Sequence, residues 1–465
     1  MEASMVRALD ARTLNRNIAR IIVPSMMESI LQLIAGLICT AMVGRLLADD
    51  IAAQGISNRI YQICYAMYRG LRIGLTVVAA TYIGEQAYGK YRRSVEQAYL
   101  TGIPAACLMA VAFAFCSGTV ARLFTDDARL IGVVVSYSRI GAWAIPFMAV
   151  SAFNAAAFNG QGDTKTPMKI AAVFNIVNVL AGYICIFGFG RFQGWGVRGA
   201  AVAMVLSQMI GALLGLWLLY RPSGALRVNA HGGRFFSLDR EMTKKLYATG
   251  IPASMESVLW QFSAIAMSRV ILDYGTYHYA AYQLGLQAET ITEMPADGFI
   301  IASTALTSRA IGEKNGPLMR GYYRQLTRMG LMVGILASAM LFLLGKEIMW
   351  LLTDKADLRV IGAGYVFLMG FAQIPQVLTK VYNGVIRAAG YIRVPMYFAF
   401  AGIWLLRVPL SMLACWIFRL PIETIWIVIV ADQTSRLFMS MAFARWKDIR
   451  HCVEKREQEG QSVLA

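Results

Sequence analysis

The chain has 465 residues, of which 57% are hydrophobic and only 15% charged. An ordinary soluble protein carries about 25% charged residues, so this composition excludes a typical soluble domain. The net charge of +17 would suit nucleic acid, but the lysines and arginines cluster in loops between apolar runs, as the positive-inside rule predicts for membrane proteins. We therefore expect no nucleic-acid partner.

The apolar residues form runs of roughly 20 or more, which is the length that an α-helix needs to cross a bilayer. Runs this long fit helices and not the shorter strands of a barrel. We predict twelve spans, in chain order, at about residues 18–44, 51–82, 95–118, 131–158, 168–190, 197–220, 247–272, 277–308, 325–345, 357–386, 395–418 and 422–444.

Alternate loops between these spans differ in charge. One set is rich in lysine and arginine and includes Arg387 and Arg393, and both termini are basic and belong with this set. The opposite set is poorer, and its member Asp273 to Tyr279 has no lysine or arginine. This bias predicts a multi-pass protein of the cytoplasmic membrane with both termini in the cytoplasm.

The longest interior polar stretch, Arg221 to Lys245, contains one proline, Pro222, and three glycines, which suit a flexible connector. The predicted organisation is a cytoplasmic N-terminal tail (1–17), an N-lobe of spans one to six (18–220), a cytoplasmic linker (221–246), a C-lobe of spans seven to twelve (247–444) and a cytoplasmic tail (445–465). The basic N-terminus lacks a short apolar core, so it is not expected to be a removable signal.

Metal and disulfide chemistry have little support in this sequence. The seven cysteines lie at irregular spacing without a CxxC pair, and the three histidines form no HExxH motif. We expect no metal site and no cofactor.

The two halves of the chain repeat each other at a step of 228 residues. Pro24, Glu28 and Gly84 match Pro252, Glu256 and Gly312, since 252 − 24, 256 − 28 and 312 − 84 all equal 228. Further matches at the same step are Ala52-Ala53 with Ala280-Ala281, Gly70 with Gly298, Thr125-Asp126 with Thr353-Asp354, Gly162 with Gly390 and Pro167 with Pro395. So many matches at one offset indicate duplication.

Each repeat holds an even number of spans, so both copies enter the membrane in the same direction. The prediction is an all-α polytopic membrane protein in which twelve transmembrane helices form two parallel six-helix repeats around a central cleft. Rocking one bundle against the other would expose such a cleft to each side in turn. This architecture is typical of a transporter.

These features resemble the multidrug and toxic compound extrusion (MATE) family. The resemblance rests on the first span and its exit, from Pro24 through Met42-Val43-Gly44-Arg45, and on span eight with Gln283, Met294-Pro295 and Gly298-Phe299. It covers nearly the whole chain. It implies a secondary antiporter that exports amphipathic drugs or xenobiotics against an inward proton or sodium flow, with a small-molecule substrate, the bilayer around it and no obligatory protein partner.

The chain departs from the family at the usual acids of the N-lobe. Cys39 stands where many members carry an aspartate, before Thr40-Ala-Met-Val-Gly44. Asn178 is present in span five, but Gly182 replaces the acid that usually follows it by four residues. The acid that some members have in span ten is missing too, because Tyr365 to Ile386 contains no Asp or Glu.

Glu256 and Glu28 are the coupling-ion candidates. An intramembrane carboxylate costs at least a few kcal/mol, so it is a functional-site candidate by default. Desolvation would raise the pKa of the carboxyl, as a proton carrier requires. The alternative is a hydrogen-bonded acid that only locks helices together. Glu28 lies nearer to the cytoplasmic end of its span, which makes it the less favoured of the two.

Arg69 and Arg72 in span two are unexpected charges that share one helix face. Asp297 in span eight corresponds to Arg69 at the 228 step. Either these arginines pair with each other or with Glu28, or snorkel to water, or they make a basic surface on the cleft. In the last case the substrate would be anionic or zwitterionic.

Other polar or aromatic residues inside spans complete the set of cleft candidates. Most are expected to hydrogen-bond between helices, and a minority to line the pocket. Gln32 and Trp260 each lie four residues after a repeat acid and share its face. The set comprises Gln32, Asn154, Asn178, Trp260 and Gln283, besides Arg69, Arg72 and Asp297.

Four rivals to a drug antiporter stay open. The nearest is a flippase or exporter of an anionic or lipid-linked envelope precursor in the same superfamily. An intramembrane enzyme is disfavoured because no nucleophile motif, metal spacing or clustered His/Cys/Asp set is present. A membrane scaffold would waste its buried charges, and a channel would need a continuous polar lining.

Overall fold

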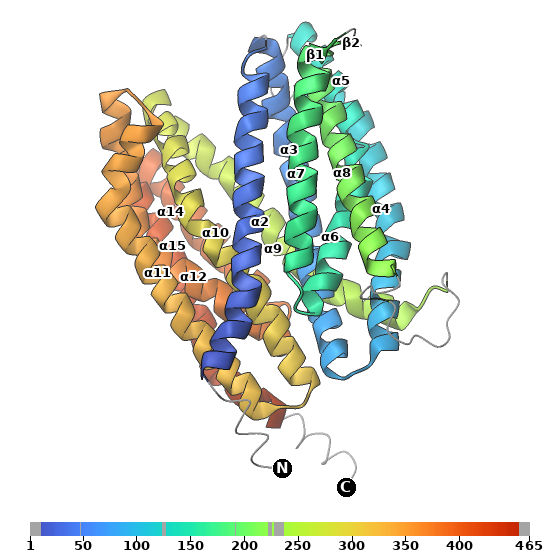
Figure 1. Cartoon of the computed structure of the whole chain (residues 1–465). Helices are drawn as coiled ribbons and strands as arrows, with labels where there is room; N and C mark the ends of the chain where they lie inside the picture. Colours follow the sequence, from blue (N-terminus) through green and yellow to red (C-terminus); the bar gives the residue numbers. More distant parts are fainter. Residues whose placement is uncertain are drawn as a thin grey trace. The chain divides into compact units, whose positions relative to one another are not determined.

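The computed structural model describes residues 11–46, 48–122, 127–190, 192–221, 226 and 237–454. Thr125, Asp126, both ends of the chain and most of the predicted linker lie outside this part. The helices, shown in Figure 1, are α2 (Ala11–Val43), α3 (Ala48–Gly84), α4 (Tyr88–Arg122), α5 (Ala128–Gly141), α6 (Ala144–Gly160), α7 (Lys165–Phe187), α8 (Val197–Tyr220), α9 (Arg240–Leu272), α10 (Thr276–Gly312), α11 (Gly316–Leu352), α12 (Ala356–Ala388), α13 (Val394–Phe400), α14 (Val408–Met412) and α15 (Glu423–Trp446).

The twelve predicted spans are confirmed as helical segments in the predicted order. α5 and α6 together make the fourth span, and α13, α14 and two π-helical stretches together make the eleventh. The repeat extends to the helix ends: α3 and α10 begin and end 228 residues apart, and α4 and α11 begin 228 apart. Gly162 and Gly390, which are also 228 apart, both adopt positive φ, at 79° and 97°.

The fourth span is broken where its repeat partner α12 is continuous. α5 and α6 are separated by Ala142 and Trp143 and bent by 43°. Pro146 in the first turn of α6 lacks a backbone N–H and disfavours a continuous helix there. The proline is not sufficient by itself, because α12 is continuous through Pro375. Hydropathy did not predict this break.

Two further departures from simple helices were also missed. A two-residue hairpin, β1 (Gly188–Phe189) with β2 (Phe192–Gln193), follows α7 where the predicted span continued to residue 190. In the eleventh span, η1 (Ala401–Arg407) and η2 (Leu413–Ile417) are π-helical. Such turns occur preferentially at functional sites.

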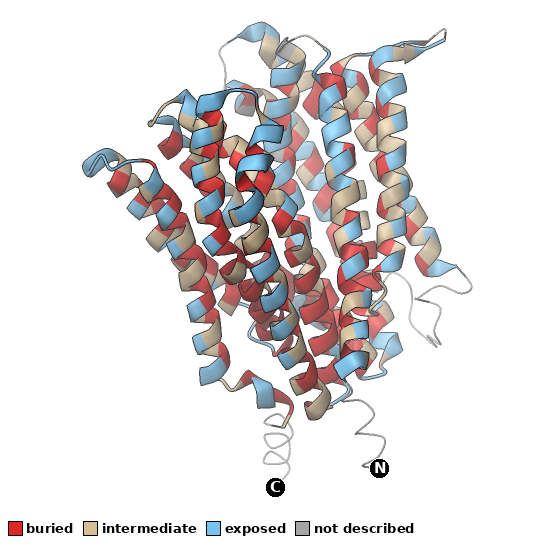
Figure 2. Cartoon of the chain, turned by 60° about the vertical axis from the view of Figure 1, so that its left-hand side comes forward, coloured by how far each residue is buried: buried red, intermediate tan, exposed pale blue. Residues whose placement is uncertain are grey.

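The exterior of these helices is apolar. Phe115 and Leu351 are each 80% exposed, and many other large hydrophobic residues are exposed as well. Figure 2 shows exposed residues along the helices and not only at their ends. Within the described part of the chain, nine helices are long and apolar enough to cross a membrane, and the bent pair α5–α6 makes a tenth. α9 and α10 are as long but are not among these helices.

The chain forms two compact units. Unit 1 comprises Met1–Met26 and Met255–Ala465, and unit 2 comprises Met27–Ser254. The boundaries fall inside α2 and α9, not in the segment 221–246, and 254 − 26 again equals the repeat step of 228. The predicted lobe boundaries and the predicted central cleft stay predictions.

Close backbone contacts explain why each unit takes the first part of a helix from the other half of the sequence. In unit 2, a Cβ on Gly70 would meet the backbone of Ser254, and one on Gly74 would meet the backbone of Gly250. Ser254 Oγ also donates a hydrogen bond of 2.6 Å to the carbonyl of Met67. In unit 1, Gly298 packs against Ile22 in the same way. Small residues thus let α3 and α10 approach the exchanged helix segments.

Candidate functional site

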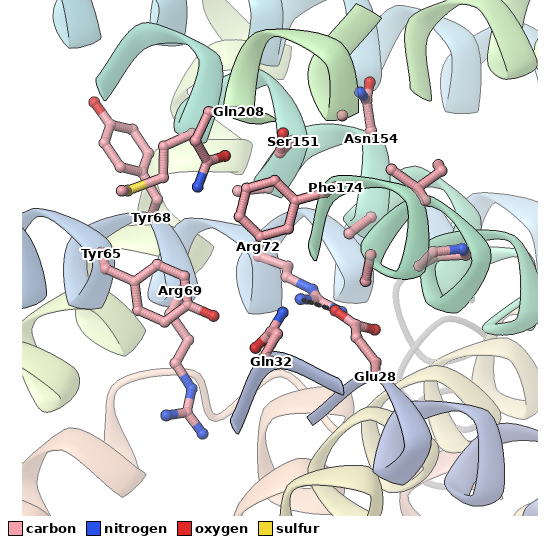
Figure 3. Close-up of a pocket in the computed structure, with 17 residues that line it drawn as sticks. Glu28, Gln32, Tyr65, Tyr68, Arg69, Arg72, Ser151, Asn154, Phe174 and Gln208 are labelled. Carbon is pink, nitrogen blue, oxygen red and sulfur yellow. Dashed lines mark hydrogen bonds and ion pairs between the residues drawn. The ribbon is translucent and has the colours of Figure 1, made fainter. Parts of the chain in front are cut away.

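A pocket lies inside unit 2, among α2, α3, α6, α7 and α8, with a cavity volume of about 110 Å³. Five of the residues predicted as coupling or cleft candidates line it, namely Glu28, Gln32, Arg69, Arg72 and Asn154. The remaining lining mixes aromatic, apolar and amide side chains, including Tyr65, Tyr68, Phe174 and Gln208 (Figure 3). This combination suits an amphipathic small molecule.

Glu28 and Arg72 face each other across this pocket. Arg72 Nη1 donates a hydrogen bond of 3.4 Å to Glu28 Oε1, and the Glu28 residue is only 9% exposed. Nη2 of Arg72 is buried without a hydrogen-bond partner in the described part of the chain. Arg69 is exposed, and its guanidinium extends away from the pair in Figure 3. Glu28 is therefore a carboxylate with a counter-charge, not an isolated acid.

Asn154 lies at the pocket wall and joins three helices. It accepts a hydrogen bond of 2.5 Å from Tyr99 Oη on α4 and donates one of 3.0 Å to the carbonyl of Ala212 on α8. Both the oxygen and the nitrogen of the amide thus bind the protein itself. Asn154 therefore supports the pocket wall, and substrate binding is not its main role.

The positions of the missing family acids lie together on α2 and α7. Asn178 Nδ2 donates to Cys39 Sγ at 3.4 Å, and Ser207 Oγ donates to Asn178 Oδ1 at 3.4 Å. The space beside Gly182 is bounded by the methyl group of Met42, which would lie 3.4 Å from a Cβ added at that glycine. These residues do not line the pocket. The cluster is neutral where family members often carry charge.

Unit 1 buries a set of ion pairs, of which only two members were predicted from the sequence. Glu256 on α9 pairs with Arg387 on α12. Arg387 was expected in a cytoplasmic loop, and this is wrong: it lies in the last turn of α12 and is 2% exposed. Burial is possible there because Glu256 supplies the opposite charge.

The second ion-pair group joins α10 to α12. Lys380 Nζ lies 2.8 Å from Glu293 Oε1 and 2.9 Å from Asp297 Oδ1. Asp297 was predicted from its repeat match with Arg69, whereas Glu293 and Lys380 were overlooked. The signal was available, because Glu289, Glu293 and Asp297 recur every four residues and so share one face of α10.

The third group centres on Asp432 of α15, which is fully buried. Arg407 Nη2 lies 2.7 Å and Arg436 Nη2 3.0 Å from Asp432 Oδ2. Arg407 ends the π-helical stretch η1 and also stacks on Trp260, with its guanidinium carbon 5.6 Å from the ring centroid. Trp260 thus has a definite role as a platform for a buried cation.

Glu289 stands apart from these pairs. It accepts a hydrogen bond of 2.7 Å from Tyr365 Oη, and the Tyr365 ring is held edge-on to Trp426, 4.9 Å between centroids. No cation forms an ion pair with Glu289 in the described ranges. Gln283 lies two turns earlier on α10 and is partly exposed.

Among the described residues of unit 1, these interior clusters therefore contain one more acid than base. Five carboxylates (Glu256, Glu289, Glu293, Asp297 and Asp432) accompany four cations (Lys380, Arg387, Arg407 and Arg436). Within the same described residues, no group of three or more His, Cys, Asp or Glu side chains could hold a metal ion.

A bundle of long apolar helices with a polar pocket and paired intramembrane charges defines a membrane transporter. The family model MatE matches residues 24–184 and 252–413, one match in each half. The chain belongs to this family, the multidrug and toxic compound extrusion transporters.

Its curated relatives span the same length. The probable multidrug resistance protein NorM of Thermotoga maritima is 26% identical over 439 residues, covering 92% of each chain. The multidrug resistance protein MdtK of Yersinia enterocolitica is 20% identical, covering 93% of this chain and 95% of its own.

Solved structures share the fold. An outward-facing multidrug resistance MATE family transporter of the MOP superfamily superposes with a TM-score of 0.84 at 17% identity, over 95% of this chain and 97% of its own. A MOP superfamily transporter from Pyrococcus furiosus gives a TM-score of 0.83 at 18% identity, over 94% and 96%. For that protein, a reverse polarity of the binding pocket is said to suggest a different function.

Proposed function

We propose that this protein is a secondary active antiporter that exports amphipathic small molecules by alternating access, driven by a proton or sodium gradient. It would act in the cytoplasmic membrane with both termini in the cytoplasm. The names of its relatives support drug export, and the pocket of unit 2 offers aromatic and polar groups for such compounds.

Glu289 carries the coupling part of the proposal. Glu256, the acid favoured by the sequence, already has Arg387 as its counter-charge. Glu289 is held by the neutral hydroxyl of Tyr365 and forms no ion pair within the described ranges. An acid without a counter-cation gains more from binding a proton or sodium ion than a paired acid does. We therefore place the coupling ion at Glu289 and keep Glu256 as the second candidate.

The test is efflux from proteoliposomes with an imposed proton or sodium gradient, using a fluorescent cationic dye and a fluorescent anionic dye. We expect Glu289→Gln to reduce gradient-driven efflux at least tenfold while dye binding is retained. Glu423→Gln, which changes an exposed acid in the first turn of α15, should transport as the wild type does. If Glu256→Gln alone removes the response to the gradient, the coupling site is Glu256 and not Glu289.

The second candidate is export of an anionic or lipid-linked precursor, and the observation in its favour is that Arg69 and Arg72 line the pocket. Arg72→Gln would leave Glu28 without its counter-charge. It should weaken binding of the anionic dye several-fold and strengthen binding of the cationic one. Equal affinities of both dyes in wild type and variant would exclude a basic substrate site.

A further inference from the structure

A basic groove lies at the start of α11 in unit 1, and none of the ion-paired residues described above lines it. It is lined by Arg320, Arg324 and Arg328 of α11, by Arg450 and His451 of η3 (Ile449–His451), and by the ring of Tyr323. Its volume is about 600 Å³. α11 begins and α15 ends at the same end of unit 1 in Figure 1, which brings the two sets of cations together.

The groove keeps an excess of positive charge. Arg320 pairs with Glu454, and His451 Nδ1 lies 3.0 Å from Asp448 Oδ1. The guanidinium of Arg450 lies over Tyr323, 5.1 Å from the ring centroid. Arg324 and Arg328 are exposed and join no ion pair within residues 237–454. Four arginines against two carboxylates leave two positive charges when His451 is neutral.

The same face of α11 changes from basic to apolar along the helix. Three to four residues beyond Arg328 come Leu331 and Met332, 42% and 56% exposed, followed by Ile335 at 50%. These positions share a helix face, and Ile335 lies only about 10 Å from Arg328 along the axis. The charged groove is thus followed along the helix by an exposed apolar surface.

The length of α11 places this transition at a membrane boundary. Its 37 residues span roughly 55 Å, whereas the hydrocarbon core of a bilayer is about 30 Å thick. The first turns of the helix must therefore reach the headgroup layer when the apolar part lies in the hydrocarbon.

The repeated sequence shows that the fold does not require these arginines. At the 228 step, Arg320, Arg324 and Arg328 correspond to Arg92, Glu96 and Leu100 of α4. Arg92 Nε there lies 2.6 Å from Glu96 Oε1. The equivalent groove of unit 2 includes Glu96, Tyr99 and Leu100, and no arginine is found among its described lining residues. Among the described residues, the basic groove therefore has no counterpart in the first half of the chain.

We propose that the basic groove binds an anionic phospholipid of the surrounding membrane. Arg324, Arg328 and Arg450 contact the phosphate, because guanidinium groups match phosphate oxygens in charge and geometry. An acyl chain lies along Leu331, Met332 and Ile335. Clustered cations at the end of a transmembrane helix are the recognised setting for anionic headgroups.

The test is native mass spectrometry of the full-length protein in detergent, titrated separately with phosphatidylglycerol, cardiolipin, phosphatidylcholine and inorganic phosphate. We expect the wild type to retain the two anionic lipids and not phosphatidylcholine. The variant Arg324→Gln/Arg328→Gln/Arg450→Gln should bind the anionic lipids at least tenfold more weakly. Arg328→Leu introduces the residue that stands at the equivalent position, Leu100. We expect it to reduce the affinity for the anionic lipids several-fold. Because Arg328 is exposed, the substitution should not impair folding.

The matched control is Lys90→Gln/Lys165→Gln/Lys169→Gln, which removes the same charge from exposed lysines elsewhere. Its affinity for the anionic lipids should lie within twofold of that of the wild type. Equal weakening by the control and the arginine variant would reduce the effect to net charge and overturn the proposal. So would retention of phosphatidylcholine as strong as that of phosphatidylglycerol. Displacement of the lipid by millimolar inorganic phosphate would overturn it too, and would make the groove a site for free phosphate.

Discussion

Two of the ion pairs in the interior of unit 1 join different helices. Arg387 and Glu256 come from α12 and α9, and Asp432 on α15 holds Arg407 from η1. Gly402 has to be a glycine beside this second pair, because a Cβ there would meet Asp432 Oδ1 and the side chain of Arg436. Individual residues are therefore coupled across the unit.

Removing one member of the Glu256–Arg387 pair should be far worse than removing both. Arg387→Leu would leave Glu256 as an uncompensated carboxylate, and breaking a buried pair costs about 3 kcal/mol or more. The double variant Glu256→Gln/Arg387→Leu should recover much of the loss. Unfolding midpoints of the purified protein in detergent measure this. If the unfolding midpoint of the double variant is no higher than that of Arg387→Leu, the two residues do not compensate each other.

Sequence reasoning identified single residues only where they broke a pattern. Glu28, Arg69 and Arg72 stand out as charges in apolar runs, and the structure gathers them around one pocket. The link between Arg407 and Asp432 had no local signal, because the two residues lie 25 positions apart and meet only through tertiary packing. Arg387 was assigned to a loop because charge counting cannot tell a loop cation from one buried at a helix end.

At the scale of elements, hydropathy predicted all twelve helical segments because a bilayer demands long apolar helices. It missed the break between α5 and α6, the hairpin β1–β2 and the π-helical stretches. These depend on backbone details such as Pro146 and on packing, which a hydropathy average does not contain.

The contact of α3 with the first part of α9 gives a prediction about helix packing. Gly70→Ala would place a Cβ against the backbone of Ser254, which has no side-chain freedom to move aside. Overpacking of this kind costs typically about 1–3 kcal/mol.

Gly55→Ala is the control in the same helix, because no atom lies within 4 Å of its added Cβ. It should be neutral or stabilise by up to about 1 kcal/mol. Both are measured as thermal unfolding midpoints in detergent. A Gly70→Ala protein as stable as Gly55→Ala would show that α3 and α9 are not in close contact.

At the scale of the whole molecule, the 228-residue repeat was predicted from landmark residues and is visible again in helix ends and in the positive φ of Gly162 and Gly390. The assignment of the first parts of α2 and α9 to units 1 and 2 was not predicted. Sequence similarity shows which residues correspond, but not which of two equivalent bundles each segment joins.

This assignment predicts that neither half of the chain folds alone. A fragment of residues 1–226 would lack the segment 240–254 that covers Gly70 and Gly74. We expect each half expressed singly to be degraded, and the two halves expressed together to copurify through an affinity tag on one of them. A stable 1–226 fragment that resists protease as the intact protein does would contradict this.

The boundaries at Met26 and Ser254 also bear on how such a chain could arise. Before duplication, a single six-helix copy with these contacts would have had a leading helix segment with no place in its own bundle and a gap left by the segment it needed. In a dimer of two copies, the leading helix segment of each copy would have filled the gap in the other, as in a domain-swapped homodimer. Fusion of the two genes would then have made an existing mutual dependence permanent, and it would have freed each half to acquire its own charges.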